Sequence, residues 1–246
     1  MTKIIDKKSA EIGLDAIQDF FFPQRCIACS ARAEAAAQLC TTCLALLPRC
    51  RNCCRRCGLP LCGIESPASC GQCLRNEPAF DSLFAAYWYE AVPRQLITAI
   101  KYSAELHYMP TLMRMFEACS PNIQEDSIFI PVPTHAARVR QRGFNANHEY
   151  LRALARRFPI RCDYGLLQRH RDTQKQATLN LRERKSNVRN AFTLRHHCDY
   201  QQVNLFDDVV TSAATVQEIS RCLKAAGVKQ VKVWSLARTK RVSNYS

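Results

Sequence analysis

Paired cysteines constrain the first third of this chain more than any other feature. The chain has 246 residues and fifteen cysteines, and eleven of these lie between Cys26 and Cys73. A gap of two residues lets both sulfurs of a tight turn reach one ion, and two such turns complete a tetrahedral thiolate cage. Such a cage is structural, because it leaves no coordination position open. We therefore predict two structural zinc sites, formed by Cys26, Cys29, Cys40 and Cys43 and by Cys54, Cys57, Cys70 and Cys73.

The ligand register has alternatives. Cys50 and Cys53 form one more pair directly before Cys54, and Cys62 is a further candidate ligand. Gly58 and Gly71 suit the positive-φ positions of tight cysteine turns. The segment is too short to bury much apolar surface, so metal binding is expected to supply most of its folding free energy.

Metal is favoured over disulfides because the chain is expected to be cytoplasmic. Residues 1–22 mix charged and apolar residues at helical spacing, which predicts a short amphipathic helix and not a signal peptide. No apolar run is long enough to span a membrane. A reducing cytosol does not sustain a disulfide framework.

The pattern changes near residues 78–81, where dense cysteines give way to apolar strands that alternate with helices. Strands are expected at 127–132, 203–206 and 228–236, and helices at 93–102, 145–158 and 214–226, with Gly227 ending the last helix. Alternation of this kind predicts a mostly parallel sheet with helices on both faces. The expected domains are a double zinc ribbon over 23–78, an α/β domain over 81–239 and a polar tail over 240–246.

An acidic, hydroxyl-rich segment follows the strand at 203–206. Asp207 and Asp208 come directly after the apolar Leu205-Phe206, and the helix begins beyond Thr215. Loops that lead from a parallel strand into a helix N-terminus bind phosphates, and adjacent carboxylates suit ribose hydroxyls or a magnesium ion held by the ligand. The alternative without a ligand is a helix capped by Thr211 or Ser212, with two solvated aspartates. We favour a ligand site made of Asp207, Asp208, Val209, Val210, Thr211, Ser212, Ala213, Ala214 and Thr215.

The middle of the chain is strongly basic. Residues 131–200 hold fifteen Lys and Arg but five Asp and Glu, and the whole chain has a formal net charge of +14. Such an excess favours nucleic acid or phosphorylated small molecules as partners, with a merely soluble basic surface as the alternative. Arginine alternates over 138–142, which in a loop would place these side chains on one side, and Phe144 is a candidate for base stacking. The predicted nucleic-acid contacts are Arg138, Arg140, Arg142, Phe144, Arg169 and Arg171, and the second basic cluster continues through residues 175–189.

Several stretches resemble the ComF/GntX family of competence-associated proteins. They include Ile100-Lys101-Tyr102, Pro131-Val132-Pro133, Gln141-Arg142-Gly143-Phe144-Asn145 and Ala191-Phe192, in the family's order. The acidic segment is similar to the phosphoribosyl-pyrophosphate signature of type I phosphoribosyltransferases. It departs from that signature at Ala213, where the family usually has glycine. A Cβ there penalises a positive φ and lies where the backbone approaches phosphate.

The resemblance implies a type I phosphoribosyltransferase-like parallel sheet preceded by a zinc module. It implies that Asp207 and Asp208 face ribose hydroxyls, that 209–215 wraps the 5′-phosphate, and that phosphoribosyl pyrophosphate with Mg²⁺ is the ligand. The implied function is handling of incoming single-stranded DNA during natural transformation. A competence helicase and a recombination mediator are the implied protein partners. Two alternatives remain: a phosphoribosyltransferase with an unidentified acceptor, and an adaptor with a vestigial nucleotide site.

Overall fold

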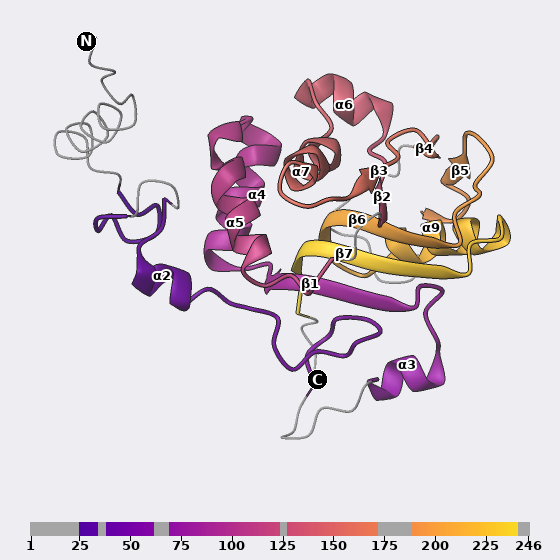
Figure 1. Ribbon diagram of the computed structural model, residues 1–246, viewed down its shortest axis with the longest axis horizontal. Helices are drawn as coiled ribbons and strands as arrows, with labels where there is room; N and C mark the ends of the chain where they lie inside the picture. Colours follow the sequence, from indigo (N-terminus) through magenta and orange to yellow (C-terminus); the bar gives the residue numbers. More distant parts are fainter. Residues whose placement is uncertain (1–24, 34–37, 62–68, 124–126, 172–187, 241–246) are drawn as a thin grey trace, which may run out of the picture. The chain divides into compact units, whose positions relative to one another are not determined.

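The computed structural model describes residues 25–33, 38–61, 69–123, 127–171 and 188–240 (Figure 1). The predicted helix over 1–22, Cys62, the basic residues at 175–185 and the tail beyond 240 lie outside them. The chain divides into two compact units, Met1–Leu47 and Pro48–Ser246. The first four predicted zinc ligands belong to the first unit. The other four belong to the second unit, together with the sheet.

A five-stranded sheet forms the centre of the second unit. Its strand order is β1-β7-β6-β2-β3, and every neighbouring pair is parallel. A separate antiparallel ribbon pairs β4 with β5. The strands are β1 (Ser82–Trp88), β2 (Ile128–Pro131), β3 (Arg161–Cys162), β4 (Leu167–Arg169), β5 (Phe192–Leu194), β6 (Gln202–Val210) and β7 (Gln230–Arg238).

Helices connect the strands and flank the cysteine turns. Two short ones, α2 (Thr41–Ala45) and α3 (Gly71–Arg75), each follow a cysteine. Gly71 therefore begins a helix, and the expected positive φ at this glycine was wrong; Gly58 does have it, at +68°. The other helices are α4 (Ala91–Ser103), the 3₁₀ turn η1 (Leu106–Tyr108), α5 (Met109–Glu117), α6 (Ala136–Arg142), α7 (Ala146–Ala155) and α9 (Ala214–Ala225).

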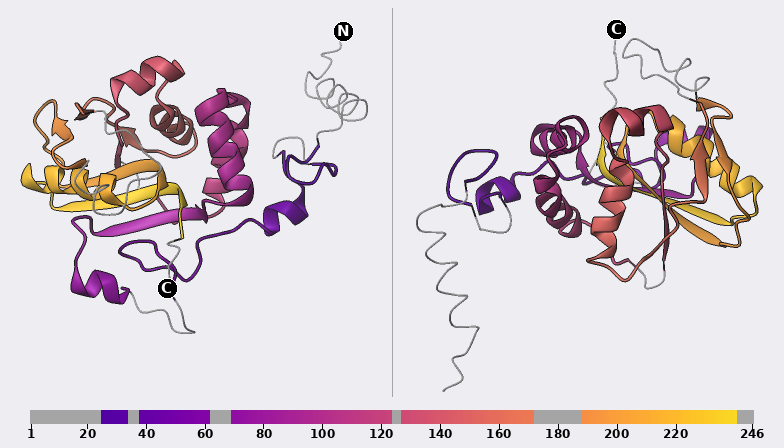
Figure 2. Two further views of the ribbon diagram at one scale, coloured as in Figure 1. Left: turned by 180° about the vertical axis from the view of Figure 1, so that it is seen from behind. Right: turned by 90° about the horizontal axis from the view of Figure 1, so that it is seen from above.

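The two faces of the sheet bury different side chains. Because successive strand residues point to opposite faces, Leu205 and Val233 lie in one core together with Ile219 and Leu223 of α9. The alternate residues Phe206 and Trp234 meet the ring of Phe116 from α5 on the other face. The sheet is thus covered on both sides (Figures 1 and 2). The predicted architecture, a parallel sheet between helices behind a cysteine-rich module, is confirmed.

Candidate functional site

The strand order reverses inside the sheet, and such a reversal marks a candidate ligand site. After β2 the chain moves outward to β3, and after β6 it moves in the opposite direction to β7, so the order reverses between β2 and β6. Ligands of open parallel sheets bind outside the carboxyl ends of the strands at such a reversal. Pro131 of β2 pairs with Phe206 of β6, so Asp207 and Asp208 continue β6 beyond the end of β2. The acidic pair predicted from sequence therefore stands at the reversal point.

A buried ion pair holds the second carboxylate. Lys101 Nζ of α4 lies 2.5 Å from Asp208 Oδ2, and both side chains are largely buried, with 11% and 6% of their surfaces exposed. The other carboxylate oxygen, Asp208 Oδ1, accepts the Val209 N–H at 2.7 Å. Burial alone would lower the pKa of Lys101, but the adjacent Asp208 outweighs it and the pKa is raised. Lys101 stays charged and supplies the counterion of Asp208.

Asn147 joins the ends of β2 and β6. Its amide nitrogen donates to Val132 O at 3.0 Å and to Asp207 Oδ1 at 3.3 Å, and its amide oxygen accepts the Asp208 N–H at 3.1 Å. Asn147 is buried in the first turn of α7, where Asn145 caps the helix. The sequence prediction did not include Lys101 or Asn147 as site residues. The only signal for Lys101 was its family-like stretch, and Asn147 carried none.

The loop after β6 turns sharply into α9. Ala213 has the left-handed φ of +61° and stands at the N-cap of the helix, and Ser212 Oγ accepts the Ala214 N–H at 3.4 Å. The position where the family usually has glycine thus carries the backbone conformation that glycine favours. This loop lines a pocket of about 110 Å³. The charged and loop residues of its lining are Lys101, Arg138, Arg142, Arg169, both aspartates and residues 209–216.

Arg238 lies buried beneath this loop. Its guanidinium donates to the carbonyls of Val210, at 2.9 Å, and of Thr211. Its Nε donates to the Cys57 carbonyl at 3.1 Å. Arg238, the last residue of β7, therefore connects the turn at Cys57 to the start of the loop at Val210 and Thr211. Nothing in the sequence distinguished this arginine from the others.

The arginines at 138–142 lie on α6, so the expected loop was wrong. His135 Nδ1 accepts the Ala137 N–H at the start of this helix, and Gly143 ends it with a φ of +82°. Residues four apart share a helix face, whereas residues two apart point to opposite sides. Accordingly Arg138 and Arg142 line the pocket, while Arg140 is exposed outside its lining.

The other predicted nucleic-acid contacts also divide into residues that line the pocket and residues that do not. Arg169 lines the pocket and stacks over the ring of Phe192 at 5.5 Å. Arg171 is exposed beyond β4, and Phe144 is half-buried; neither lines the pocket. Tyr102 does not line the pocket either, but its ring is next to Arg142 and 64% of the residue is accessible. The Arg142 guanidinium lies over that ring, 4.9 Å from its centroid.

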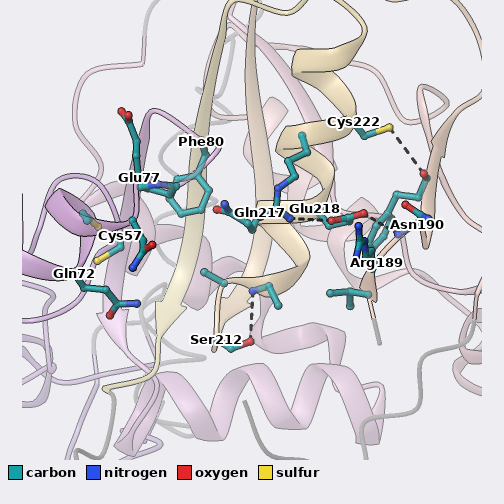
Figure 3. A pocket seen from close by; sticks show the side chains of 18 of the residues that line it. Cys57, Gln72, Glu77, Phe80, Arg189, Asn190, Ser212, Gln217, Glu218 and Cys222 are labelled. Carbon is teal, nitrogen blue, oxygen red and sulfur yellow. Dashed lines mark hydrogen bonds and ion pairs between the residues drawn. The ribbon is translucent and has the colours of Figure 1, made fainter. Parts of the chain in front are cut away.

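A larger groove of about 1590 Å³ meets the small pocket at residues 212–214 (Figure 3). On one side, the groove is lined by Gln72 of α3 and by Glu77, which follows that helix. On the other side, it is lined by Gln217 and Glu218 of α9. Glu218 accepts the Asn190 N–H at 2.7 Å and pairs with Arg221. The groove lining mixes apolar side chains with cationic and anionic ones.

Both cysteine quartets have the geometry of zinc cages. Within each quartet all four sulfurs lie within 4.8 Å of one another. The sulfurs of Cys29 and Cys40 are 3.7 Å apart, as are those of Cys57 and Cys70. A tetrahedral zinc ion with Zn–S bonds of about 2.3 Å requires S···S distances of about 3.8 Å. The predicted register therefore fits two zinc ions. Cys50 and Cys53 belong to neither quartet.

Within the second quartet, backbone amides favour the thiolate form of Cys54, whereas burial raises the pKa of Cys57 and of Cys73. Burial raises the pKa of Cys54, but N–H groups of Cys57, Cys70 and Arg56 outweigh this and lower the pKa to about 7. The turn also packs directly on the sheet, because a Cβ added at Gly58 would lie 2.5 Å from Leu83 Cδ2 of β1. A side chain at position 58 would require Leu83 to shift, and it would also be strained by the φ of +68°.

A comparison with known protein families agrees with the two cysteine quartets. The model of the double zinc ribbon domain matches residues 17–74, which include both quartets. Among solved structures, Trypanosoma cruzi hypoxanthine phosphoribosyl transferase is 14% identical, with a TM-score of 0.29 over 63% of this chain and 71% of that one. None of the helices in the described ranges is long and apolar enough to cross a membrane.

Curated relatives match over nearly the full length. Competence protein F of Haemophilus influenzae is 30% identical over 234 residues, which cover 89% of this chain and 98% of the relative. DNA utilization protein YhgH of Escherichia coli O6:H1 is 31% identical over 207 residues, which cover 82% and 90%. The protein of the same name in strain K12 is 30% identical over the same length. The chain therefore belongs to the family of competence protein F and DNA utilization protein YhgH, which the sequence resemblance had indicated.

Proposed function

We propose that this protein binds single-stranded DNA in the cytoplasm during DNA uptake or use, and that its pocket between β2 and β6 binds a ribose-phosphate group such as that of phosphoribosyl pyrophosphate. The observation that carries the proposal is one small pocket that joins a helix start, two carboxylates and four cationic side chains. The names of the relatives, which refer to competence and DNA utilization, support the DNA part.

Single-strand binding rests on the rim of the pocket. Proteins that bind single strands combine cationic side chains along the backbone path with aromatic rings on which bases stack. Arg138 and Arg142 supply the charge from one face of α6, and Tyr102 supplies an exposed ring beside them. Tyr102 thus takes the stacking role that the sequence had assigned to Phe144.

Ribose-phosphate binding rests on the loop and the carboxylates. The first N–H groups of α9 and the hydroxyls of Thr211, Ser212 and Thr215 suit the phosphate, and Asp207 suits the sugar. Direct coordination of Mg²⁺ by Asp208 does not fit, because both of its oxygens are engaged, by Lys101 and by the Val209 N–H. Under this proposal the pyrophosphate oxygens of the ligand, and not Asp208, hold any Mg²⁺.

Binding of a fluorescent single-stranded oligonucleotide over a salt series tests the function. We expect Arg138→Ala with Arg142→Ala to lower the affinity and to flatten the slope of log K against log salt, since each lost phosphate contact removes about 0.7 from that slope. Arg140→Ala with Arg171→Ala is the matched control, because it also removes two positive charges, both from outside the pocket lining. Absence of strand binding at any salt, or equal losses in both variants, would reject the proposal.

Phosphoribosyl transfer is the second candidate function. It is favoured by two carboxylates and a helix start that line one pocket, with Asn147 hydrogen-bonded to both aspartates. Release of pyrophosphate from phosphoribosyl pyrophosphate in the presence of a base or amine acceptor would support it. Asp207→Asn should abolish that release.

A further inference from the structure

The small pocket has the wrong size for a whole nucleotide and the right chemistry for its sugar-phosphate end. Pockets that enclose a complete small ligand usually exceed about 300 Å³, whereas this one holds about 110 Å³. A ligand that enters it must therefore leave most of its atoms outside. Its charged lining residues, four cationic and two anionic, favour an anion.

The loop is suited to a terminal phosphate. A phosphate monoester carries a charge of about −1.5 to −2 and three terminal oxygens, whereas an internal phosphodiester has two such oxygens and both of its esters continue into the chain. Residues 211–215, which lead into the first turn of α9, line the pocket. A DNA strand can place a monoester there only through its own end. The 5′ end carries it on the C5′ methylene, whereas a 3′-phosphate is attached directly to the sugar ring and would have to bring that ring into a pocket of about 110 Å³.

The second aspartate does not oppose an anionic strand. Asp208 is already paired with Lys101 at 2.5 Å, so no divalent cation is needed to offset the charge of Asp208. Arg142, which lines the pocket, also covers the ring of exposed Tyr102, so a base adjoining the bound end would find a stacking surface at the rim.

We propose that the pocket recognises the 5′-phosphorylated end of single-stranded DNA, with the terminal phosphate at residues 211–215 and the adjoining base against Tyr102. This inference rests on the proposed function, because it requires that the protein bind single strands. It adds that one end of the strand is preferred and names the group that is read.

Three oligonucleotides of one sequence test the inference, with a phosphate at the 5′ end, a phosphate at the 3′ end, or no terminal phosphate. Charge-assisted hydrogen bonds are stronger than neutral ones, so we expect at least about tenfold tighter binding of the 5′-phosphorylated strand. The 3′-phosphorylated strand has the same charge and should bind like the unmodified one. Equal binding of all three would overturn the inference but leave strand binding intact, whereas no binding would also reject the proposed function.

Two variants at Thr215 locate the effect. Thr215→Glu places a negative charge in the pocket at the first turn of α9, where acidic residues favour helices, so the fold should persist. We expect it to abolish the 5′-phosphate preference. Thr215→Gln has nearly the same size without the charge and should retain most of it. An undiminished preference in Thr215→Glu, or much tighter binding of 5′-phosphorylated RNA than of DNA, would overturn the assignment.

Discussion

At the scale of single residues, the ion pair between Lys101 and Asp208 sets the electrostatics of the site. Removing one partner of a buried pair leaves an uncompensated charge, whereas removing both is far less costly. The two residues lie 107 positions apart, on α4 and β6, so no local sequence pattern predicts their contact. The acidic pair was predictable because it follows a strand, but its counterion depends on the packing of α4.

We expect Lys101→Met to lower the free energy of unfolding by about 3 kcal/mol, since it strands Asp208 without its counterion. Urea unfolding monitored by tryptophan fluorescence measures this loss. Adding Asp208→Asn should restore most of it. Lys240→Met is the control, because the exposed pair of Lys240 with Glu90 should contribute at most about 1 kcal/mol. Equal losses in the two single variants would contradict the assigned role of the pair.

Ala213 is strained by its left-handed backbone. Ala213→Gly should raise the free energy of unfolding by about 0.5–1 kcal/mol, because glycine adopts this conformation without a Cβ penalty. Ala104→Gly is a matched control, since Ala104 has a φ of +55° at the end of α4, outside the pocket lining. Both variants should gain stability in urea unfolding. Titration calorimetry should show tighter phosphoribosyl pyrophosphate binding in Ala213→Gly alone; unchanged binding there would show that the Cβ does not hinder phosphate.

At the scale of elements, the sequence predicted the parts whose signals are local. The helices at 145–158 and 214–226 and the strands at 127–132 and 228–236 correspond to α7, α9, β2 and β7, because their apolar residues recur with the period of the element. In contrast β1 was not predicted. Its residues, SLFAAYW, show no alternation, and they become a strand by pairing with β7 from the end of the chain. Helix α6 was missed because it has no buried residue to set a period.

We expect the quartet of Cys54, Cys57, Cys70 and Cys73 to be coupled to the loop at residues 209–215 through Arg238. Cys54→Ser with Cys70→Ser should remove one zinc ion, displace the Cys57 carbonyl from Arg238 and weaken phosphoribosyl pyrophosphate binding. Cys29→Ser with Cys43→Ser should also remove one zinc ion, but it should leave ligand binding unchanged. Metal analysis of each purified variant and ligand titration measure both effects. Equal weakening in the two variants, or none in either, would contradict the coupling.

At the scale of the whole molecule, the positive charge has a location that composition does not give. The net charge of +14 predicted a polyanionic partner. In the described part of the chain, Lys101, Arg138, Arg142 and Arg169 converge on one pocket from α4, α6 and β4, whereas Arg140 and Arg171 do not. Sequence reasoning predicted the acidic loop that lines the pocket and both cysteine quartets, because their residues are neighbours in the chain. It could not select among the arginines, because that depends on which face of α6 is turned toward the pocket.

Competition between a DNA strand and phosphoribosyl pyrophosphate tests the central claim most directly, because one pocket is assigned to both. A labelled 5′-phosphorylated oligonucleotide is held at half-saturation while phosphoribosyl pyrophosphate is added, and fluorescence anisotropy reports the bound fraction. We predict that saturating ligand lowers the apparent affinity of the strand to that of the same oligonucleotide without a terminal phosphate. We also predict that Thr215→Glu abolishes the effect. A strand affinity that is unchanged at saturating phosphoribosyl pyrophosphate would contradict the account.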